Sequence, residues 1–105
     1  MKAIRIQIIS FISDDQPGFV ESVFTDAWEH EYKIQEKTPI VTEKYLNAFS
    51  EYPQDGFIAC EITKKWIDKN ERVIFTVTTE KPWAVETIDG LTEFDILEEQ
   101  LIDIN

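Results

Sequence analysis

Alternation of apolar and polar positions is the dominant pattern along this chain, and it is clearest over residues 57–79. The apolar positions of this stretch are Ile58, Cys60, Ile62 and Trp66, followed by Val73, Phe75 and Val77. A period of two in β-branched and aromatic residues is typical of a strand with one buried face. Between the two arms, residues 68–71 are polar and include Asn70, which tolerates the left-handed conformation of a tight turn. The pattern predicts a long β-hairpin, which needs further strands on its apolar face because a lone hairpin is marginal in water.

The same period predicts further strands in the rest of the chain. They cover residues 3–12, 19–25, 28–36, 83–87 and 92–97. The first of them is apolar on both sides over residues 9–12, so we expect its second half to lie centrally in a sheet. In the third, one face carries Trp28, His30, Tyr32 and Ile34. The strands are separated by turn signals at residues 13–18, Asp26-Ala27, residues 80–82 and Asp89-Gly90.

One short helix is expected between the strands. Thr42 can cap a helix over residues 43–49, where Tyr45, Leu46 and Phe49 give one apolar side. Residues 39–41 should be extended, because Pro39 has no N–H for a central ladder. For the tail, residues 98–105, helix, strand and disorder all remain open.

These elements predict a mainly β fold with one short helix, in a single globular domain over residues 1–105. A small antiparallel barrel is favoured over a sandwich, because closure removes exposed strand edges. The expected core includes Ile6, Ile8, Tyr32, Ile34, Ile58, Cys60, Ile62, Phe75 and Val77.

The charge balance narrows the range of partners. Ten Lys and Arg against 21 Asp and Glu give a formal net charge of −11. Such a field repels phosphate backbones and anionic membranes, so we expect neither nucleic acid nor a membrane as a partner. A basic protein is the natural complement, although an acidic surface also simply keeps a small protein soluble.

The single cysteine and the first residues bear on location. Cys60 has no second cysteine for a disulfide or a Cys-based zinc site, which suits a reducing compartment. Arg5 and Gln7 interrupt any signal-peptide core, and no apolar run approaches the ~20 residues of a spanning helix. We therefore expect a cytoplasmic protein.

Part of the chain resembles a known group of proteins. The residues concerned are Gly-Phe-Val-Glu at 18–21, Asp-Ala-Trp at 26–28, His30, and Glu-Lys-Thr-Pro-Ile-Val at 36–41. This stretch, Gly18 to Val41, is similar to a family of small uncharacterised bacterial β-domain proteins. The resemblance implies a bacterial source, and it implies no functional residues.

Candidate catalytic chemistry is sparse. His30 is the single imidazole, and its place on an apolar face favours a packed side chain over a general base. Cys60 lies mid-strand, where a buried small hydrophobe is expected. Carboxylates gather at Asp14-Asp15, at Glu29 and Glu31, and at Glu98-Glu99 with Asp103, but none has the spacing of a Ca²⁺ loop. We expect no catalytic residue, no metal site and no cofactor.

One set of residues is a candidate interaction patch. Two Glu-Lys pairs, at Glu36 and Glu80, each come shortly before a proline corner. If the corners lie at one end of a barrel, an aromatic patch with an acidic rim would form there from Trp28, Tyr52, Trp83, Glu36 and Glu80. Aromatic side chains that plug the barrel ends are the alternative.

Three classes of function stay open. A non-catalytic interaction module, of the inhibitor or immunity type, that binds a basic partner is favoured by the charge and by the missing catalytic constellation. A small-ligand binder or hydrolase-like enzyme that uses carboxylates is the second. The third is a self-assembling structural module, with a homodimer through a strand edge as its simplest form.

Overall fold

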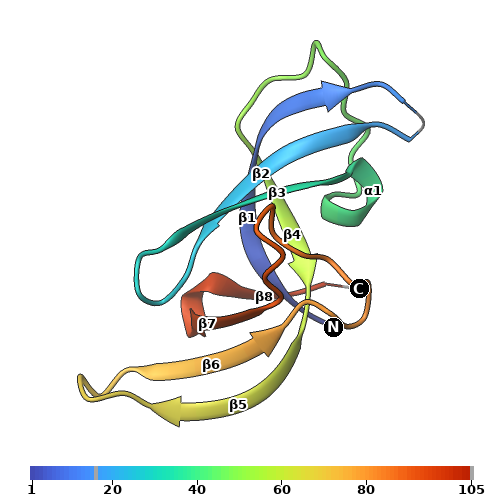
Figure 1. Ribbon diagram of the computed structural model, residues 1–105. Helices are drawn as coiled ribbons and strands as arrows, with labels where there is room; N and C mark the ends of the chain where they lie inside the picture. The colour runs from blue at the N-terminus through green and yellow to red at the C-terminus, as the bar shows by residue number, and fades with distance from the viewer. Residues whose placement is uncertain (16, 105) are drawn as a thin grey trace.

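The computed structural model describes residues 1–15 and 17–104, and it confirms the mainly β class (Figure 1). The elements are β1 (Lys2–Ser13), β2 (Phe19–Thr25), β3 (Glu31–Lys37), α1 (Thr38–Val41), β4 (Gln54–Ala59), β5 (Glu61–Ile67), β6 (Val73–Thr78), β7 (Glu93–Leu97), the 3₁₀ turn η1 (Glu98–Gln100) and β8 (Leu101–Asp103). None of the described helices is long and apolar enough to cross a membrane.

The strands form two antiparallel sheets. The first has the order β3-β2-β1-β4, with β8 also paired to β1, and the second has the order β5-β6-β7. β1 organises the first sheet: β4 pairs with it from Ala3 to Ile8, whereas β8 and β2 share its other side. Whether the two sheets are best classed as a barrel or a sandwich stays a prediction.

The first half of β1, and not the second, is the central part of the sheet. Ile4, Ile6 and Ile8 are buried, as the pattern predicted. The ladder to β4 ends at Ile8, and beyond it Ile12 has an exposed fraction of 46%. The expectation of a central second half is therefore wrong, because that half has a described strand, β2, on one side only.

Residues 57–79 do not form one hairpin. The chain changes sheets at Cys60: residues before it belong to β4 and pair with β1, whereas β5 begins at Glu61 and pairs with β6. The Cys60 amide donates to the carbonyl of Lys2 at 2.9 Å, which fixes the crossing point. An uninterrupted period of two in the sequence does not reveal where the chain crosses between sheets, because the segments before and after Cys60 are both strands.

The hairpin of β5 and β6 contains a bulge, and one residue of the expected core lies directly before it. The β5–β6 register shifts between Ile62 and Lys64, so Thr63 is the extra residue. Ile62 is 38% exposed, and its assignment to the core is wrong. The predicted turn is confirmed, but Glu71, with φ 63°, holds the left-handed conformation in place of Asn70.

The short helix exists at a different place. It spans Thr38–Val41, with Pro39 in its first turn, so residues 39–41 are not extended. Proline suits this position, because its fixed φ matches a helix start and the first helical N–H needs no partner. Residues 43–49 are not helical, and two of the three side chains expected to pack, Tyr45 and Phe49, are exposed.

The segments after β6 differ in part from the sequence prediction. Residues 83–87 do not form a strand: residue 83 ends a turn, and the amides of Ala84 and Val85 donate back to the carbonyls of Glu80 and Thr79. The turn at Asp89-Gly90 is confirmed, with Gly90 at φ 82°. The ambiguous tail becomes η1 and then β8, while its last residue, 105, lies outside the described residues, as does residue 16 of the predicted turn at 13–18.

The core lies where the two sheets meet. Six expected members are buried, namely Ile6, Ile8, Ile34, Ile58, Cys60 and Val77, and two others, Tyr32 and Phe75, pack at the margin of the cluster. Aromatic contacts cross between the sheets, because the ring of Phe94 on β7 lies 5.0 Å, centroid to centroid, from both Phe24 and Tyr32. This aromatic junction is also the inner wall of the candidate site.

Candidate functional site

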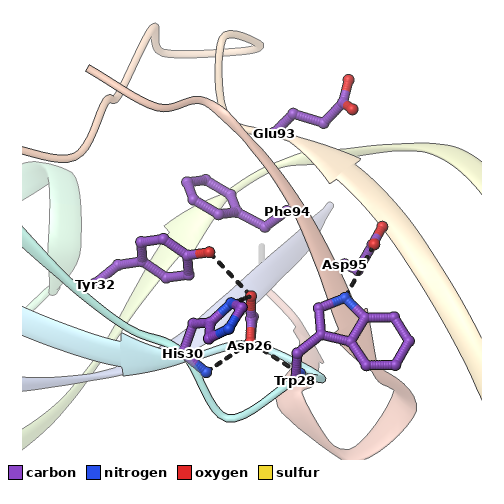
Figure 2. A pocket seen from close by; sticks show the side chains of 7 residues that line it. All are labelled: Asp26, Trp28, His30, Tyr32, Glu93, Phe94 and Asp95. Atoms are coloured by element: carbon purple, nitrogen blue, oxygen red, sulfur yellow. Dashed lines mark hydrogen bonds and ion pairs between the residues drawn. The ribbon is translucent and has the colours of Figure 1, made fainter. Parts of the chain in front are cut away.

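A small hollow opens where the β2–β3 turn crosses the outer edge of β7 (Figure 2). The amide of Ala27 donates to the carbonyl of Asp95 at 2.8 Å, so the turn adds to the second sheet. The hollow has a volume of about 160 Å³ and is lined by Asp26, Trp28, His30, Tyr32, Glu93, Phe94 and Asp95. We call it the Asp26 hollow.

Asp26 is the buried centre of this site. It is 3% exposed, and its Oδ1 accepts the backbone amides of Trp28 and His30, each at 2.9 Å. The turn is thereby closed around a side chain, with Glu29 in the left-handed region at φ 65°. Because residues 28–30 serve this turn, β3 begins only at Glu31, and the predicted start of the strand at Trp28 is wrong.

His30 lies at the surface, against expectation. Its side chain is 68% exposed, and its Nδ1 lies 3.5 Å from Oδ2 of Asp26. The interpretation of His30 as a packed side chain is therefore wrong. The alternation correctly placed His30 with Trp28 and Tyr32, since all three line the hollow. However, residue 30 belongs to the turn, because β3 begins only at Glu31.

Tyr32 completes the set of partners of Asp26. Its hydroxyl donates to Oδ2 of Asp26 at 3.0 Å (Figure 2). Burial raises the pKa of Tyr32, and the hydrogen bond and the negative charge of Asp26 add to that increase. The phenol therefore stays neutral and holds the carboxylate in place over the ordinary pH range.

A second network fixes Trp28. Its indole Nε1 donates to Oδ2 of Asp95 at 3.2 Å, and Oδ1 of the same carboxylate accepts the Thr76 hydroxyl at 2.7 Å. That hydroxyl in turn accepts the indole N–H of Trp66 at 3.1 Å. The guanidinium of Arg72 lies 5.4 Å from the centroid of the Trp28 ring, within the range of a cation–π contact.

Arg72 is itself held by Asp68. The Nε of Arg72 lies 3.0 Å from Oδ2 of Asp68, and the Arg72 amide donates to Oδ1 at 2.9 Å. The backbone hydrogen bond from Arg72, followed by its side chain and the amide of Asn70, lowers the pKa of Asp68. The tip of the β5–β6 hairpin is thus tied to the outer side of the Trp28 ring.

The chemistry of the hollow suits a cation. Its walls combine the aromatic rings of Trp28, Tyr32 and Phe94 with three carboxylates. Two of these, Asp26 and Asp95, are engaged in the networks above, whereas Glu93 is exposed and its carboxylate has no hydrogen bond or ion pair among the described residues. Across residues 1–15 and 17–104, no group of three or more His, Cys, Asp or Glu side chains is arranged to hold a metal ion.

The five residues of the predicted patch lie in separate surroundings. Trp28 is in the Asp26 hollow, Tyr52 packs at the core margin and donates its hydroxyl to the Asn47 carbonyl at 2.9 Å, and Trp83 is 40% exposed. Glu36 accepts the amide of Lys37, and Glu80 is exposed. In the described part of the chain, no hydrogen bond, ion pair or ring contact joins any two of the five.

Sequence reasoning missed two sets of residues. Glu93 and Asp95 alternate with buried Phe94 and Ile96, which indicates that both lie on the outer face of β7. This alternation does not reveal that they lie beside Trp28. Tyr45 and Phe49 are 88% and 95% exposed, which the helical spacing of residues 43–49 concealed.

Comparison with protein-family models, with curated proteins and with solved structures finds no match to this chain. The resemblance of residues 18–41 to small bacterial proteins therefore stays a prediction.

Proposed function

We propose that this protein is a non-catalytic interaction module, of the inhibitor or immunity type, and that the Asp26 hollow receives a Lys or Arg side chain of a basic partner protein. The observation that supports the proposal is the composition of the hollow, whose lining combines the rings of Trp28, Tyr32 and Phe94 with Glu93, an exposed residue at the rim whose carboxylate has no partner among the described residues (Figure 2). Rings beside an acid suit a cationic group, which gains a cation–π contact and an ion pair together.

The field of the whole molecule favours the same partner. A net charge of −11 accelerates the encounter with a basic protein and makes that encounter sensitive to salt. The proposal includes a cytoplasmic location, which the buried free thiol of Cys60 suits. We also propose that the fold is a small barrel and not a sandwich, with the β2–β3 turn as a bridge between the two sheets.

A hydrolase-like function is the second candidate, because one observation favours it. The imidazole of His30 lies at the surface 3.5 Å from a buried carboxylate, an arrangement that can orient a general base. However, both oxygens of Asp26 already accept hydrogen bonds that close the turn. The arrangement therefore has a sufficient structural role without catalysis.

A peptide titration tests the proposal. The probe is a short Gly-Arg repeat peptide, with a Gly-Gln repeat as its neutral match, and binding is followed through Trp fluorescence and backbone amide shifts. We expect Glu93→Gln to weaken binding of the Arg peptide by about three- to tenfold. Glu36→Gln is the matched control, since it removes one negative charge from the end of β3 distant from the hollow.

The control also separates the two candidate surfaces. Equal weakening by Glu93→Gln and Glu36→Gln would show that only net charge matters, and this would refute the role of the hollow. A larger effect of Glu36→Gln would locate the binding site around Glu36, one residue of the patch predicted from the sequence, and would also refute the role of the hollow. Hydrolysis of ester or peptide substrates that is lost in His30→Gln would favour the enzymatic alternative.

A further inference from the structure

A second exposed surface lies at the opposite end of the β2–β3 hairpin from the Asp26 hollow. It is built by the end of β1, the β1–β2 turn and the loop between α1 and β4, which meet at the top of Figure 1. Its most prominent side chains are Tyr45 and Phe49, with exposed fractions of 88% and 95%. We call it the Tyr45 surface.

Tyr45 forms a ridge between two hollows. The first, of about 470 Å³, is lined chiefly by Phe11, Ile12, Tyr45, Ala48 and Phe49, with Ser13, Asp14 and Asn47. The second, of about 570 Å³, is lined by Pro17, Thr38, Pro39, Thr42, Glu43, Lys44, Tyr45 and Leu46. Apolar surface predominates in the walls of both hollows, although four of the eight residues around the second are polar or charged. Each hollow is larger than the Asp26 hollow.

The loop that presents the two aromatic rings is fixed by specific contacts. Side chains within it cap its own turns: the Asn47 carboxamide accepts the amide of Phe49 at 2.8 Å, and the Ser50 hydroxyl accepts the amide of Asn47 at 3.0 Å. Leu46, between the two exposed aromatics, is buried and anchors the segment in the core. The rings are thus held outward by an anchored backbone.

Exposed aromatic side chains beside apolar hollows are the typical centre of a protein interface, where Tyr and Trp contribute most of the binding energy. Scattered single apolar residues are normal on a surface, but this surface gathers Ile12, Tyr45 and Phe49 around one edge of the molecule. The arrangement indicates an occupant that places apolar side chains on both sides of the Tyr45 ridge.

Charge decides what kind of occupant fits. Asp14 and Glu43 line the two hollows against one basic residue, Lys44, within a molecule of net charge −11. A second copy of this chain would bring the same acids face to face, which disfavours self-association. A segment of another protein that carries Lys or Arg beside apolar residues would complement both the apolar character and the negative charge of this surface.

We propose that the Tyr45 surface is a second docking site, which binds an extended segment of another protein with apolar residues flanked by Lys or Arg. This site is independent of the Asp26 hollow, because the β2–β3 hairpin separates them: the β1–β2 turn precedes Phe19 and the β2–β3 turn follows Thr25. The protein can therefore contact one partner, or two, at both ends of this hairpin.

The experiment is a selection from a peptide-display library on the immobilised protein. The test variant is Tyr45→Ser with Phe49→Ser, and both residues are so exposed that folding should not change. The matched control is Ile88→Ser with Leu91→Ser, which also removes two exposed apolar side chains but from the loop before β7. The enriched peptide is then synthesised and titrated into all three proteins.

We expect enrichment of peptides that combine apolar and basic residues. Binding should weaken about tenfold or more in the Tyr45→Ser/Phe49→Ser variant and remain unchanged in the control pair and in Glu93→Gln. Amide shifts should concentrate in residues 11–14 and 42–49. Because Glu93→Gln affects only the first site, failure of either site can be recognised separately.

Three results would overturn the proposal. The first is that no enriched peptide depends on Tyr45 and Phe49. The second is enrichment of acidic peptides, which would contradict the charge argument. The third is concentration-dependent self-association of the parent protein, seen by sedimentation and abolished in the double variant, because the occupant would then be a second copy.

Discussion

Replacement of Asp26 by alanine is the sharpest test of how the β2–β3 turn is built. The change leaves the amides of Trp28 and His30 and the hydroxyl of Tyr32 without their acceptor. A hydrogen bond to a charged group contributes about 1.5–3 kcal/mol, and an orphaned buried donor costs about 1–3 kcal/mol. Three such bonds would sum to more than the true effect, because the two amides are only partly buried and water can replace the carboxylate there.

Removal of the carboxylate also has a stabilising effect on the folded state. A buried charge has a desolvation cost that disappears with the side chain, which lowers the net loss. We therefore expect Asp26→Ala to decrease the free energy of unfolding by about 2–4 kcal/mol. Asp26→Asn keeps an oxygen for the two amides, so it should cost only about 1 kcal/mol. Small domains have about 5–15 kcal/mol in total, so both effects are measurable.

Urea unfolding followed by far-UV circular dichroism and Trp fluorescence gives these values. Asp55→Ala is the matched control, because Asp55 is an exposed carboxylate that accepts one side-chain hydrogen bond, from Gln7, at 2.6 Å. It should change the stability by less than about 0.5 kcal/mol. If Asp26→Ala is as stable as Asp55→Ala, the buried carboxylate does not hold the turn, and the account of the Asp26 hollow fails with it.

Three further predictions concern the interior. Ser22 is 1% exposed and its hydroxyl has no hydrogen-bond partner in the described part of the chain, so Ser22→Ala should raise the free energy of unfolding by up to about 1 kcal/mol in urea titrations. A Cβ on Gly56 would lie 2.8 Å from the Val41 carbonyl oxygen and 3.0 Å from Ile8, so Gly56→Ala should destabilise the protein by about 1–3 kcal/mol, and an unchanged melting temperature would refute the close approach. Burial raises the pKa of Cys60 from 9.0 to about 11. Because the folded state favours the neutral thiol, its contribution to stability is complete below pH 9 and decreases as the pH rises towards 11, so Cys60→Ala should show a shallower loss of stability over that interval.

The sequence pattern predicted most strands but not how they combine. The sequence pattern identified β1, β2, β6 and β7, and burial alternates with a period of two along β2, along β7 and from Ile4 to Ile8 of β1. It could not show that the chain changes sheets at Cys60, since strands of both sheets alternate alike. Register is set by pairing, and the bulge at Thr63, which shifts the register of the residues after Ile62, has no local signature.

The site was less predictable than the fold for a similar reason. Trp28 was recognised as a candidate, but its partners, Arg72 in the β5–β6 turn and Asp95 on β7, lie far along the sequence. The net charge of the chain indicated a basic partner, but it could not show where on the molecule that partner binds. Tyr45 and Phe49 were assigned to a buried helix face, because their spacing fits 3.6 residues per turn whereas turn capping by Asn47 and Ser50 holds them outward.

The bulged strand β5 bears on how this protein behaves at high concentration. β5 is the outer strand of its sheet, and an unpaired outer strand can recruit other chains into aggregates. Here the Thr63 bulge interrupts the regular row of backbone groups, and the next two residues, Lys64 and Lys65, are exposed and positively charged. Two β5 strands paired about Lys64 would place like charges directly opposite each other. β5 is therefore built to discourage edge-to-edge pairing and fibril growth, and a homodimer through this strand edge is disfavoured.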